Sequence, residues 1–474
     1  MFFKQFYDQP LAQASYLIGC QATGEAIVVD PLRDPAPYLQ VARAEGLRIT
    51  HITETHIHAD FVSGARELRA ATGAQLFLSA EGGSDWQYAF AAGDGATLLR
   101  DGDVIMVGNL RFDVLHTPGH TPEHLSFIVT DTPRAAGPMG ILTGDFVFVG
   151  DVGRPDLLEK AAKIANTMEA GARTLFASLQ RFRALPDHLQ VWPGHGAGSA
   201  CGKALGAVPS STVGYEKRAN WGVATTDEGE FVRTVLDGQP EAPRYFAEMK
   251  RINRDGPPVL GSLAPLPLVA AIDVAEQVAT RGPGLWCIDL RPASAFAARH
   301  VPGSLSVPYG RSFSTWVGSI VPYDVEVVLL APAEGMDAAA SDALVAAARA
   351  DLLRIGLDRV TGWASADQVI TAFAQRGGRL GAIAQRPVTS VRDDALPVVD
   401  VRGHSEWAAG HLPNAVHIPL GELTDRVADL PAGAFGVQCQ SGARSAIASS
   451  LLHRLGRTDA INLEGGYAAW ARPS

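Results

Sequence analysis

The chain has 474 residues, of which 47% are hydrophobic and 19% are charged. This composition is typical of a folded globular protein, and the length suits about three ordinary domains. The formal net charge of −10 argues against nucleic acid or an anionic membrane as a main partner, because both attract basic surfaces.

The first residues, MFFKQFYDQPLAQ, place polar residues and a proline where a signal peptide would have its apolar stretch. No apolar run approaches the roughly 20 residues that span a bilayer. The cysteines Cys20, Cys201, Cys287 and Cys439 are too scattered for a disulfide framework or a Cys-x-x-Cys metal site. We therefore expect a cytoplasmic protein without a membrane partner.

The first 250 or so residues alternate between strand patterns and helix patterns. Helices are predicted over 34–46 and 62–73, and strands over 14–19, 25–31, 49–55, 76–78, 104–107, 111–116, 125–129 and 140–143. Stretches rich in proline and glycine predict linkers over 252–268 and 375–387.

The last 200 or so residues contain an internal repeat. The segment DLRPASAFAARHVPGSLSVP, from Asp289, aligns without gaps to DVRGHSEWAAGHLPNAVHIP, from Asp400. His300 and Pro302 recur as His411 and Pro413. We infer that one α/β fold is present in two copies.

Candidate metal ligands follow several of the predicted strands. The run from Thr55 to Phe61 reads as His-x-His-x-Asp-His with phenylalanine in place of the last histidine. His120, Asp145 and His195 follow in later loops, each beside glycine or proline, where the backbone can turn a ligand inward. Scattered structural histidines are the alternative, but four loops in this order favour a metal site.

This pattern resembles the metallo-β-lactamase superfamily over about the first 250 residues, which implies an αβ/βα sandwich with a metal at its edge. In members with two metals, three histidines bind one metal, Asp and two histidines bind the other, and an Asp bridges them. The matching residues are His56, His58 and His120 at one site, Asp60, Phe61 and His195 at the other, and Asp145 between them. Phenylalanine has no lone pair to donate, so the second site is defective.

Within the superfamily, the pattern most resembles persulfide dioxygenases, which hold one Fe(II) per chain by two histidines and one aspartate. The matching ligands are His56, His120 and Asp145, and such a set leaves three positions open for water, substrate sulfur and O2. The remaining residues of the signature would orient ligands or water: His58, Asp60 and His195. His116 and His124 match no ligand position and are expected to be local structure.

A further run, Gly150-Asp151-Val152-Gly153-Arg154-Pro155-Asp156, resembles the family's Gly-x-Gly-Arg-x-Asp with one residue more between the glycines. Arg154 aligns with the arginine that binds the substrate carboxylate in glutathione-dependent relatives; a salt bridge is the alternative. The cations Lys203, Lys217 and Arg218 could hold an anionic thiol carrier, although solvated charges are the commoner case. Cys201 could approach this pocket or be a small buried thiol.

A second site is predicted at Cys439, which ends a short apolar segment and precedes a helix pattern. Successive backbone N–H groups at a helix N-terminus bind anions and stabilise negative charge on sulfur. We expect Cys439 to be a nucleophile assisted by the charge of Arg444. The rest of the anion-binding loop would be Gln440, Ser441, Gly442, Ala443 and Ser445.

The segment from Asp400 before this loop and the run EGGYAAW after it resemble a rhodanese sulfurtransferase domain, over about residues 386–474. Cys439 to Arg444 spans six residues, the loop size of sulfurtransferases; the related dual-specificity phosphatases use one residue more. The earlier copy, about 263–378, has no cysteine in its matching segment, Val327 to Gly335, and Cys287 lies too early. It is expected to be an inactive rhodanese-like domain.

The whole chain resembles persulfide dioxygenase–rhodanese fusions with a silent middle copy. The expected fold is α/β: a metallo-β-lactamase sandwich, residues 1–252, followed by two rhodanese-like α/β domains. The resemblance implies that the first domain oxidises a low-molecular-weight persulfide, such as glutathione persulfide, with O2 to sulfite. Cys439 would carry sulfane sulfur between persulfide and sulfite or thiosulfate, in sulfide detoxification or sulfur assimilation.

Two alternatives remain. A thioester hydrolase of the glyoxalase II type, fused to a sulfurtransferase, needs a metal-bound hydroxide and usually two metals, which Phe61 disfavours. A non-catalytic sulfur-relay or sensor protein would bind the metal without consuming O2. Because the family often forms dimers or tetramers, we also expect a homo-oligomer.

Overall fold

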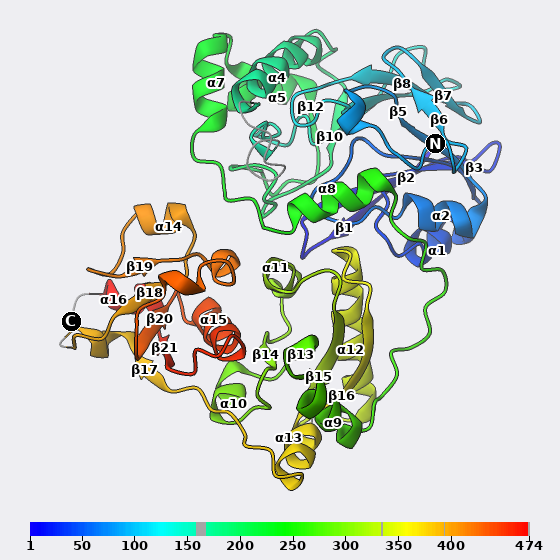
Figure 1. Ribbon diagram of the computed structural model, residues 1–474. Coiled ribbons are helices and arrows are strands. Elements are labelled where there is room, and N and C mark those ends of the chain that lie inside the picture. The colour runs from blue at the N-terminus through cyan, green and yellow to red at the C-terminus, as the bar shows by residue number, and fades with distance from the viewer. Residues whose placement is uncertain (158–166, 333–334, 393, 473–474) are drawn as a thin grey trace. The chain divides into compact units, whose positions relative to one another are not determined.

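The structure is a computed structural model that describes residues 1–157, 167–332, 335–392 and 394–472 (Figure 1). Internal contacts divide the chain into two compact units. The first is Met1–Leu263 with Arg354–Gly356, and the second is Ala264–Leu353 with Leu357–Ser474.

In the described part of the first unit, two six-stranded sheets form the framework. The first sheet has the order β1 (Phe2–Asp8), β2 (Gln13–Cys20), β3 (Glu25–Val29), β4 (Arg48–Thr53), β5 (Gln75–Ser79) and β6 (Thr97–Leu99). The second has the order β12 (Ser211–Thr212), β11 (Gln190–Pro193), β10 (Gly140–Gly144), β9 (Leu125–Asp131), β8 (Leu110–His116) and β7 (Val104–Val107). Strands β1 to β3 are antiparallel, and β3 to β6 run parallel.

The two sheets pack face to face with helices on their outer faces. Strand β3 shows how the sequence achieves this: Ile27 and Val29 join the core between the sheets, whereas Ala26 and Val28 join the core under the helices. Successive side chains of a strand point to opposite faces, so a strand buried on both sides is apolar throughout. The predicted αβ/βα sandwich is confirmed.

In the part of the first unit that the structure describes, the helices are α1 (Ala36–Ala44), α2 (Ala65–Thr72), α4 (Met168–Arg183), α5 (Val213–Ala219), α6 (Trp221–Ala224), α7 (Glu228–Leu236) and α8 (Phe246–Asp255). Helix α8 corrects the predicted linker over 252–268. The first four residues of that predicted linker, 252–255, are the last four residues of the helix. Phe246, Met249 and Asn253 are buried along this helix, and this packing outweighs the breaking effect of the following Gly-Pro-Pro.

The second unit contains two parallel sheets. One has the order β14 (Leu305–Ser306), β13 (Leu285–Asp289), β15 (Glu326–Ala331) and β16 (Val360–Ser365). The other has the order β17 (Gln385–Pro387), β21 (Ala460–Glu464), β20 (Phe435–Gln438), β18 (Val398–Asp400) and β19 (Val416–His417). The predicted linker over 375–387 therefore ends in a strand.

The helices of these sheets are α9 (Ala271–Arg281), α10 (Ala293–Ala298), α11 (Phe313–Ile320), α12 (Ala338–Arg354), α13 (Ala366–Gln375), α14 (His404–Ala408), α15 (Ala443–Arg454) and α16 (Gly466–Trp470). Short 3-10 turns are η1 (Ser84–Trp86), η2 (Gly282–Gly284), η3 (Val388–Val391), η4 (Leu420–Glu422) and η5 (Val427–Asp429).

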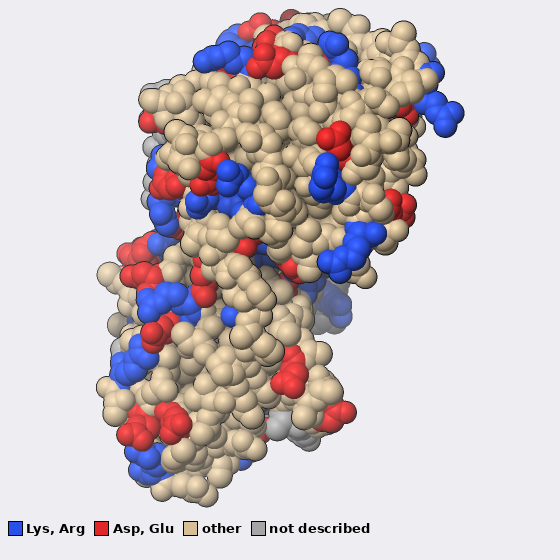
Figure 2. Space-filling view, turned by 90° about the vertical axis from the view of Figure 1, so that its right-hand side faces the viewer, with Lys and Arg blue, Asp and Glu red and all other residues tan. Residues whose placement is uncertain are grey.

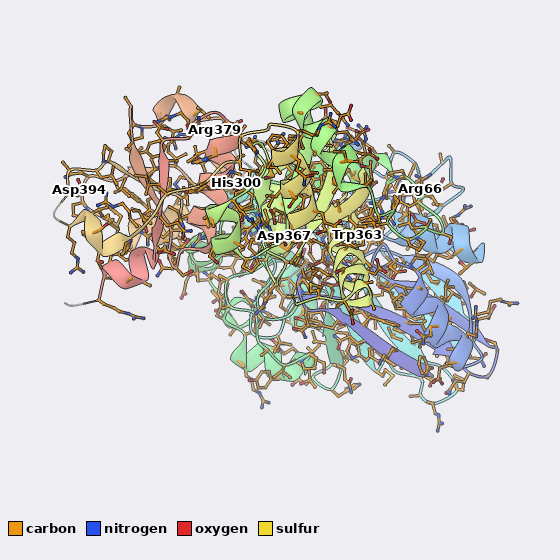
Figure 3. All side chains as sticks on the ribbon, turned by 90° about the horizontal axis from the view of Figure 1, so that it is seen from below. Arg66, His300, Trp363, Asp367, Arg379 and Asp394 are labelled. Atoms are coloured by element: carbon orange, nitrogen blue, oxygen red, sulfur yellow. The ribbon has the colours of Figure 1, made fainter. Side chains whose placement is uncertain are left out.

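The internal repeat is visible in the geometry. In the first copy the strands lie in the order β14, β13, β15 and β16. The corresponding strands of the second copy lie in the same order: β19, β18, β20 and β21. His300, labelled in Figure 3, stacks on Phe296 with ring centroids 4.1 Å apart. Its counterpart His411 stacks on Trp407 at 3.7 Å. Both copies of the histidine also hydrogen-bond through Nδ1 to the carbonyl of that aromatic residue, at 3.0 Å.

Among the described residues, no helix is both long and apolar enough to cross a membrane. On the face drawn in Figure 2, acidic and basic side chains are interspersed rather than separated by sign.

Candidate functional site

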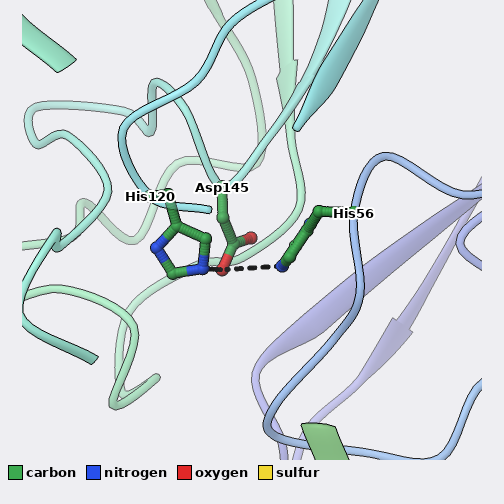
Figure 4. A group of neighbouring side chains, drawn as sticks. All are labelled: His56, His120 and Asp145. Atoms are coloured by element: carbon green, nitrogen blue, oxygen red, sulfur yellow. Dashed lines mark ion pairs between the residues drawn. The ribbon is translucent and has the colours of Figure 1, made fainter. Parts of the chain in front are cut away.

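His56, His120 and Asp145 come together at one edge of the sandwich (Figure 4). They lie in the loops that follow β4, β8 and β10, and each is at most 2% exposed. Oδ2 of Asp145 lies 4.0 Å from Nε2 of His56 and 3.5 Å from Nε2 of His120. One ligand atom from each residue fits within a group no wider than 4.8 Å.

Hydrogen bonds fix the orientation of both imidazoles. Nδ1 of His56 lies 2.9 Å from the hydroxyl of Thr55, and Nδ1 of His120 lies 3.1 Å from the carbonyl oxygen of Arg154. Since that carbonyl can only accept, His120 carries its proton on Nδ1 and leaves a lone pair on Nε2. Burial lowers the pKa of His120 and, far more, that of His56, which keeps both rings neutral and able to bind a metal.

The carboxylate of Asp145 also indicates a metal site. Neither of its oxygens has a hydrogen-bond partner among the described residues, although the side chain is buried. An unpartnered buried carboxylate beside two imidazole lone pairs is unfavourable unless a cation lies between them. The residues therefore fit a divalent metal.

The other residues of the histidine signature lie around this group. His58 turns its Nε2 toward Oδ1 of Asp30, at 3.1 Å; burial disfavours its charged form, but Asp30 raises its pKa to about 9. Nε2 of His195 lies 3.2 Å from Oδ2 of Asp60 and 3.6 Å from Oδ1 of Asp145. Phe61 is fully buried against the His58 ring, 4.4 Å between centroids.

The sequence patterns did not identify three residues that position the ligand loops: His124, Asp30 and Asn253. His124, expected to be local structure, accepts a hydrogen bond at Nε2 from the backbone N–H of Asp145, at 3.1 Å. Asp30 accepts the N–H and the hydroxyl of Thr55, at 2.6 and 2.9 Å, from a left-handed backbone conformation with φ of 51°. A non-glycine residue with this φ is uncommon and is often found at functional sites.

Asn253 on α8 holds the loop after His58. Its side chain donates to the carbonyl oxygens of His58 and Phe61, at 2.8 and 2.7 Å, and accepts the N–H of Ser63, at 2.9 Å. The partners are nearly 200 positions apart, and no sequence signal marks this contact. Asp30 could have been identified from the sequence, because it is a polar residue directly after an apolar strand.

Gly153 lies against the metal loops, because a Cβ at this position would overlap the carbonyl oxygen of Asp145 and press on Cβ of His120. We expect Gly153→Ala to lower metal affinity about 10- to 100-fold, the usual cost of disturbing residues that orient ligands. Metal titration of the apo-protein measures this. Gly137→Ala, where a Cβ meets nothing within 4 Å, is the matched control; equal affinity in both variants would contradict the assignment.

Arg154 does not face an open pocket. Its side chain is fully buried and pairs with both oxygens of Asp156, each at 2.7 Å, while Nη1 donates to the carbonyl of Ala200 at 2.8 Å. A substrate carboxylate would have to replace Asp156, so the salt-bridge alternative describes the geometry better. The prediction that Arg154 binds substrate stays a prediction.

Two of the three cations in the predicted carrier-binding segment are bound within the protein. Nζ of Lys203 donates to carbonyl oxygens of the α7 region and lies 4.8 Å above the ring of Trp221. Nζ of Lys217 pairs with Asp187 at 2.6 Å. These contacts favour a structural role over binding of a thiol carrier.

The second candidate site lies where β20 ends and α15 begins. Sγ of Cys439 accepts the N–H of Gly442 at 3.1 Å, and Gly442 has a left-handed φ of 107° that turns the chain into the helix. The carbonyls of Cys439 and Gln440 accept the N–H groups of Tyr467 and Ala468, at 2.7 and 3.0 Å. Because α16 engages these carbonyls, the loop can present N–H groups, such as that of Gly442, to negative charge on the sulfur.

The polar side chains of this loop form hydrogen bonds mainly with other residues of the protein. The hydroxyl of Ser445 donates to the side-chain oxygen of Asn462 at 2.7 Å, and the side-chain amide oxygen of Gln440 accepts from Arg402 at 3.2 Å. Arg444 donates twice to Glu406, at 2.6 and 2.7 Å. An anion entering the loop therefore competes with Glu406 for Arg444.

The earlier copy lacks the nucleophile. Asp289 pairs with Leu330 across the sheet, as Asp400 pairs with Gln438, so Ala331 stands where Cys439 stands. Part of the matching loop, residues 333–334, lies outside the described residues.

Comparison with known proteins agrees with this geometry. The model of the metallo-beta-lactamase superfamily matches residues 8–195, and that of the rhodanese-like domain matches residues 388–473. A solved metallo-beta-lactamase from Staphylococcus aureus subsp. aureus COL is 41% identical, with a TM-score of 0.66, over 77% of this chain and 99% of that one. The chain belongs to the metallo-beta-lactamase superfamily and carries a rhodanese-like domain near its C-terminus.

Curated relatives of two different activities match at similar identity. Hydroxyacylglutathione hydrolase from Rhodospirillum rubrum is 31% identical over 186 residues, 38% of this chain and 60% of that protein. Persulfide dioxygenase ETHE1 from Homo sapiens is 29% identical over 196 residues, 40% of this chain and 67% of that protein. The chain spans 61% of the beta-lactamase hydrolase-like proteins from Xylella fastidiosa that it matches. Identity alone does not decide between hydrolysis and oxidation.

Proposed function

We propose that the first unit oxidises thiol persulfides with O2 at one Fe(II) held by His56, His120 and Asp145. The observation that carries the proposal is the ligand set, two neutral imidazoles and one carboxylate, beside a buried Phe61 where a two-metal signature has histidine. Such a set suits non-haem Fe(II) and leaves adjacent positions open. Iron held by these three residues would supply the redox chemistry for the reaction of O2 with the persulfide sulfur.

The chain's own residues would keep that site in shape. Thr55 and the carbonyl of Arg154 hold the two imidazoles, and His124 holds the backbone of Asp145. Because these partners are buried, the ligands would need little rearrangement when the metal enters. The overall reaction converts a persulfide, O2 and water into the parent thiol, sulfite and two protons.

We further propose that Cys439 transfers sulfane sulfur. Its thiolate would attack the outer sulfur of a persulfide, form a cysteine persulfide and release the parent thiol; sulfite would then take that sulfur and leave as thiosulfate. The N–H of Gly442, which reaches Sγ, would stabilise negative charge there. The reverse sequence would return sulfur from thiosulfate to a thiol.

We assign the proposed activities to separate segments of the chain. Oxidation is assigned to residues 1–252 and sulfur transfer to residues 386–474, and residues 263–378 are proposed to be an inactive copy. Ala331 in place of Cys439 supports the silent middle copy. A cytoplasmic location and a homo-oligomer remain expectations.

Thioester hydrolysis is the second candidate, favoured by the likeness to hydroxyacylglutathione hydrolase. An oxygen electrode separates the two. We expect the iron-loaded protein to consume O2 and form sulfite when glutathione persulfide is added, and to leave S-lactoylglutathione intact. Thioester cleavage by a zinc-loaded protein, without O2 uptake by the iron-loaded one, would favour the hydrolase.

A further inference from the structure

Glu406 holds the side chain that would attract an anion to the thiol loop. Its two carboxylate oxygens accept from the two terminal nitrogens of Arg444, at 2.6 and 2.7 Å, in the planar pairing that suits a guanidinium and a carboxylate. Burial alone would raise the pKa of Glu406, but Arg444 outweighs this effect and holds that pKa below its usual value. The carboxylate is therefore charged, and it compensates the charge of Arg444 before any substrate arrives.

A second ion pair beside the loop is compensated in the same way. Arg402, which donates to the side chain of Gln440, pairs with Asp400 at 2.8 Å and lies 4.2 Å from the centre of the Tyr467 ring. Together with the pair described above, two arginines face two carboxylates, and their four charges sum to zero. The N-terminus of α15 adds only about half a positive charge.

A further contact fixes the position of Glu406. Its Oε2 also accepts the N–H of Gly403, at 3.1 Å, and so caps the first turn of α14. The middle copy, which has Ala331 at the position of Cys439, has Ala295 at the position of Glu406. The carboxylate and the thiol are therefore absent together from one copy and present together in the other, as expected if both serve the same site.

We propose that Glu406 sets the charge selectivity of the thiol loop, so that the loop takes sulfur from donors of low charge, such as a thiol persulfide, and disfavours the thiosulfate dianion. The reacting end of a persulfide carries at most one negative charge, whereas thiosulfate carries two. Because Coulomb energy is proportional to the charge of the ligand, compensation of Arg444 costs a dianion twice the attraction that it costs a monoanion. This inference rests on the proposed sulfur transfer by Cys439 and makes Glu406 a positioning residue that acts through Arg444.

The selectivity would apply to binding in both directions of transfer. When thiosulfate is the donor, its S–S bond breaks, Sγ of Cys439 gains the outer sulfur, and sulfite leaves with the electron pair. When thiosulfate is the product, the same weak attraction lets the dianion leave readily. The loop would thus favour a persulfide as donor and thiosulfate as product.

Glu406→Gln tests the charge while keeping a hydrogen-bond acceptor for Gly403 or Arg444. We expect kcat/KM for thiosulfate, measured as thiocyanate formed with cyanide, to rise about tenfold through a lower KM. This is the Coulomb effect of one charge on a dianion about 6 Å away with water-like screening. With glutathione persulfide under anaerobic conditions, the rise should be the square root of that value, about threefold. Added salt should reduce both gains.

Glu326→Gln is the matched control. Glu326 begins β15 of the middle copy, pairs with Arg281 at 2.7 Å, and has a side chain that is 31% exposed, against 32% for Glu406. This variant should use both donors as the unaltered protein does. A kcat/KM for thiosulfate that stays constant or falls in Glu406→Gln, or an equal change for both donors, would overturn the proposal.

Alkylation of Cys439 gives a readout that does not require sulfur transfer. Iodoacetate and iodoacetamide both lose iodide to a thiolate, but only iodoacetate is negatively charged. The ratio of their rates at Cys439, followed by mass spectrometry of the peptide, should rise about threefold in Glu406→Gln and stay constant in Glu326→Gln. An unchanged ratio would overturn the charge effect. A raised ratio in a protein that transfers no sulfur would support the charge effect and reject the proposed transfer.

Discussion

Replacing His56 with alanine is expected to lower the rate of O2 consumption with glutathione persulfide by at least about 100-fold. Losing a residue that merely orients a metal ligand already costs about 10- to 100-fold in metal affinity or activity, and His56 is assigned as a ligand itself. An oxygen electrode gives the rate, and iron content measured on the same samples shows whether the loss follows the metal.

His188→Ala is the matched control for this experiment. His188 belongs to the same unit, is exposed, and bonds only to the carbonyl of Pro138, at 3.3 Å, among the contacts of the described residues. The control should consume O2 like the unaltered protein. If the His56 variant did so too, with iron still bound, the assignment of the ligands would be wrong.

Replacing Cys439 with serine is expected to lower sulfur transfer from thiosulfate by at least about a thousandfold, because serine cannot carry a sulfane sulfur and loss of a covalent nucleophile is costly. Thiocyanate formed from thiosulfate and cyanide measures this step. Oxygen uptake with preformed glutathione persulfide should stay at the level of the unaltered protein, because the metal ligands are untouched.

Cys20→Ser serves as the control here. Cys20 lies in the first unit, where its sulfur accepts the N–H of Asn109 at 3.3 Å, a bond that a serine hydroxyl can also accept. This variant should keep both activities. Substantial transfer by Cys439→Ser would show that another group carries the sulfur and would remove the thiol loop from the mechanism.

The sequence predicted well those features that depend on neighbouring residues. Alternating apolar patterns gave the strands of the sandwich, and the ligand loops were found because each follows a strand and contains glycine or proline. The repeat was found because Asp289 and Asp400 begin the same pattern. These signals are local, so a single sequence contains them in full.

Residues that act across the fold could not be found in this way. Asn253 reads as part of a linker, yet it binds the backbone of the metal loop. Arg154 matches a substrate-binding position, but its side chain is committed to Asp156 and Ala200. Cys201 reads as a single cysteine near charged residues, and only the fold brings it to Asp60 and His195. Such contacts join segments whose proximity depends on the whole topology.

A comparison of the middle copy with the last copy distinguishes residues that the fold requires from residues that the proposed chemistry requires. It retains the pairing of Asp289 with Arg291, at 2.7 Å, which repeats that of Asp400 with Arg402, at 2.8 Å. It has alanine at the position of Cys439, and Ala295 where Glu406 contacts Arg444. This copy, which we propose to be inactive, has kept the ion pair within its sheet and lacks these groups of the thiol loop.

The contact of Asn253 with the loop after His58 also has a consequence for biosynthesis. On the ribosome, the strands and loops that carry His56, His120 and Asp145 emerge well before α8 does. Until α8 packs, the carbonyls of His58 and Phe61 lack the amide that holds them. We therefore expect the metal loop of a nascent chain to stay open until nearly the whole first unit has left the exit tunnel, which makes stable metal capture a late event in synthesis.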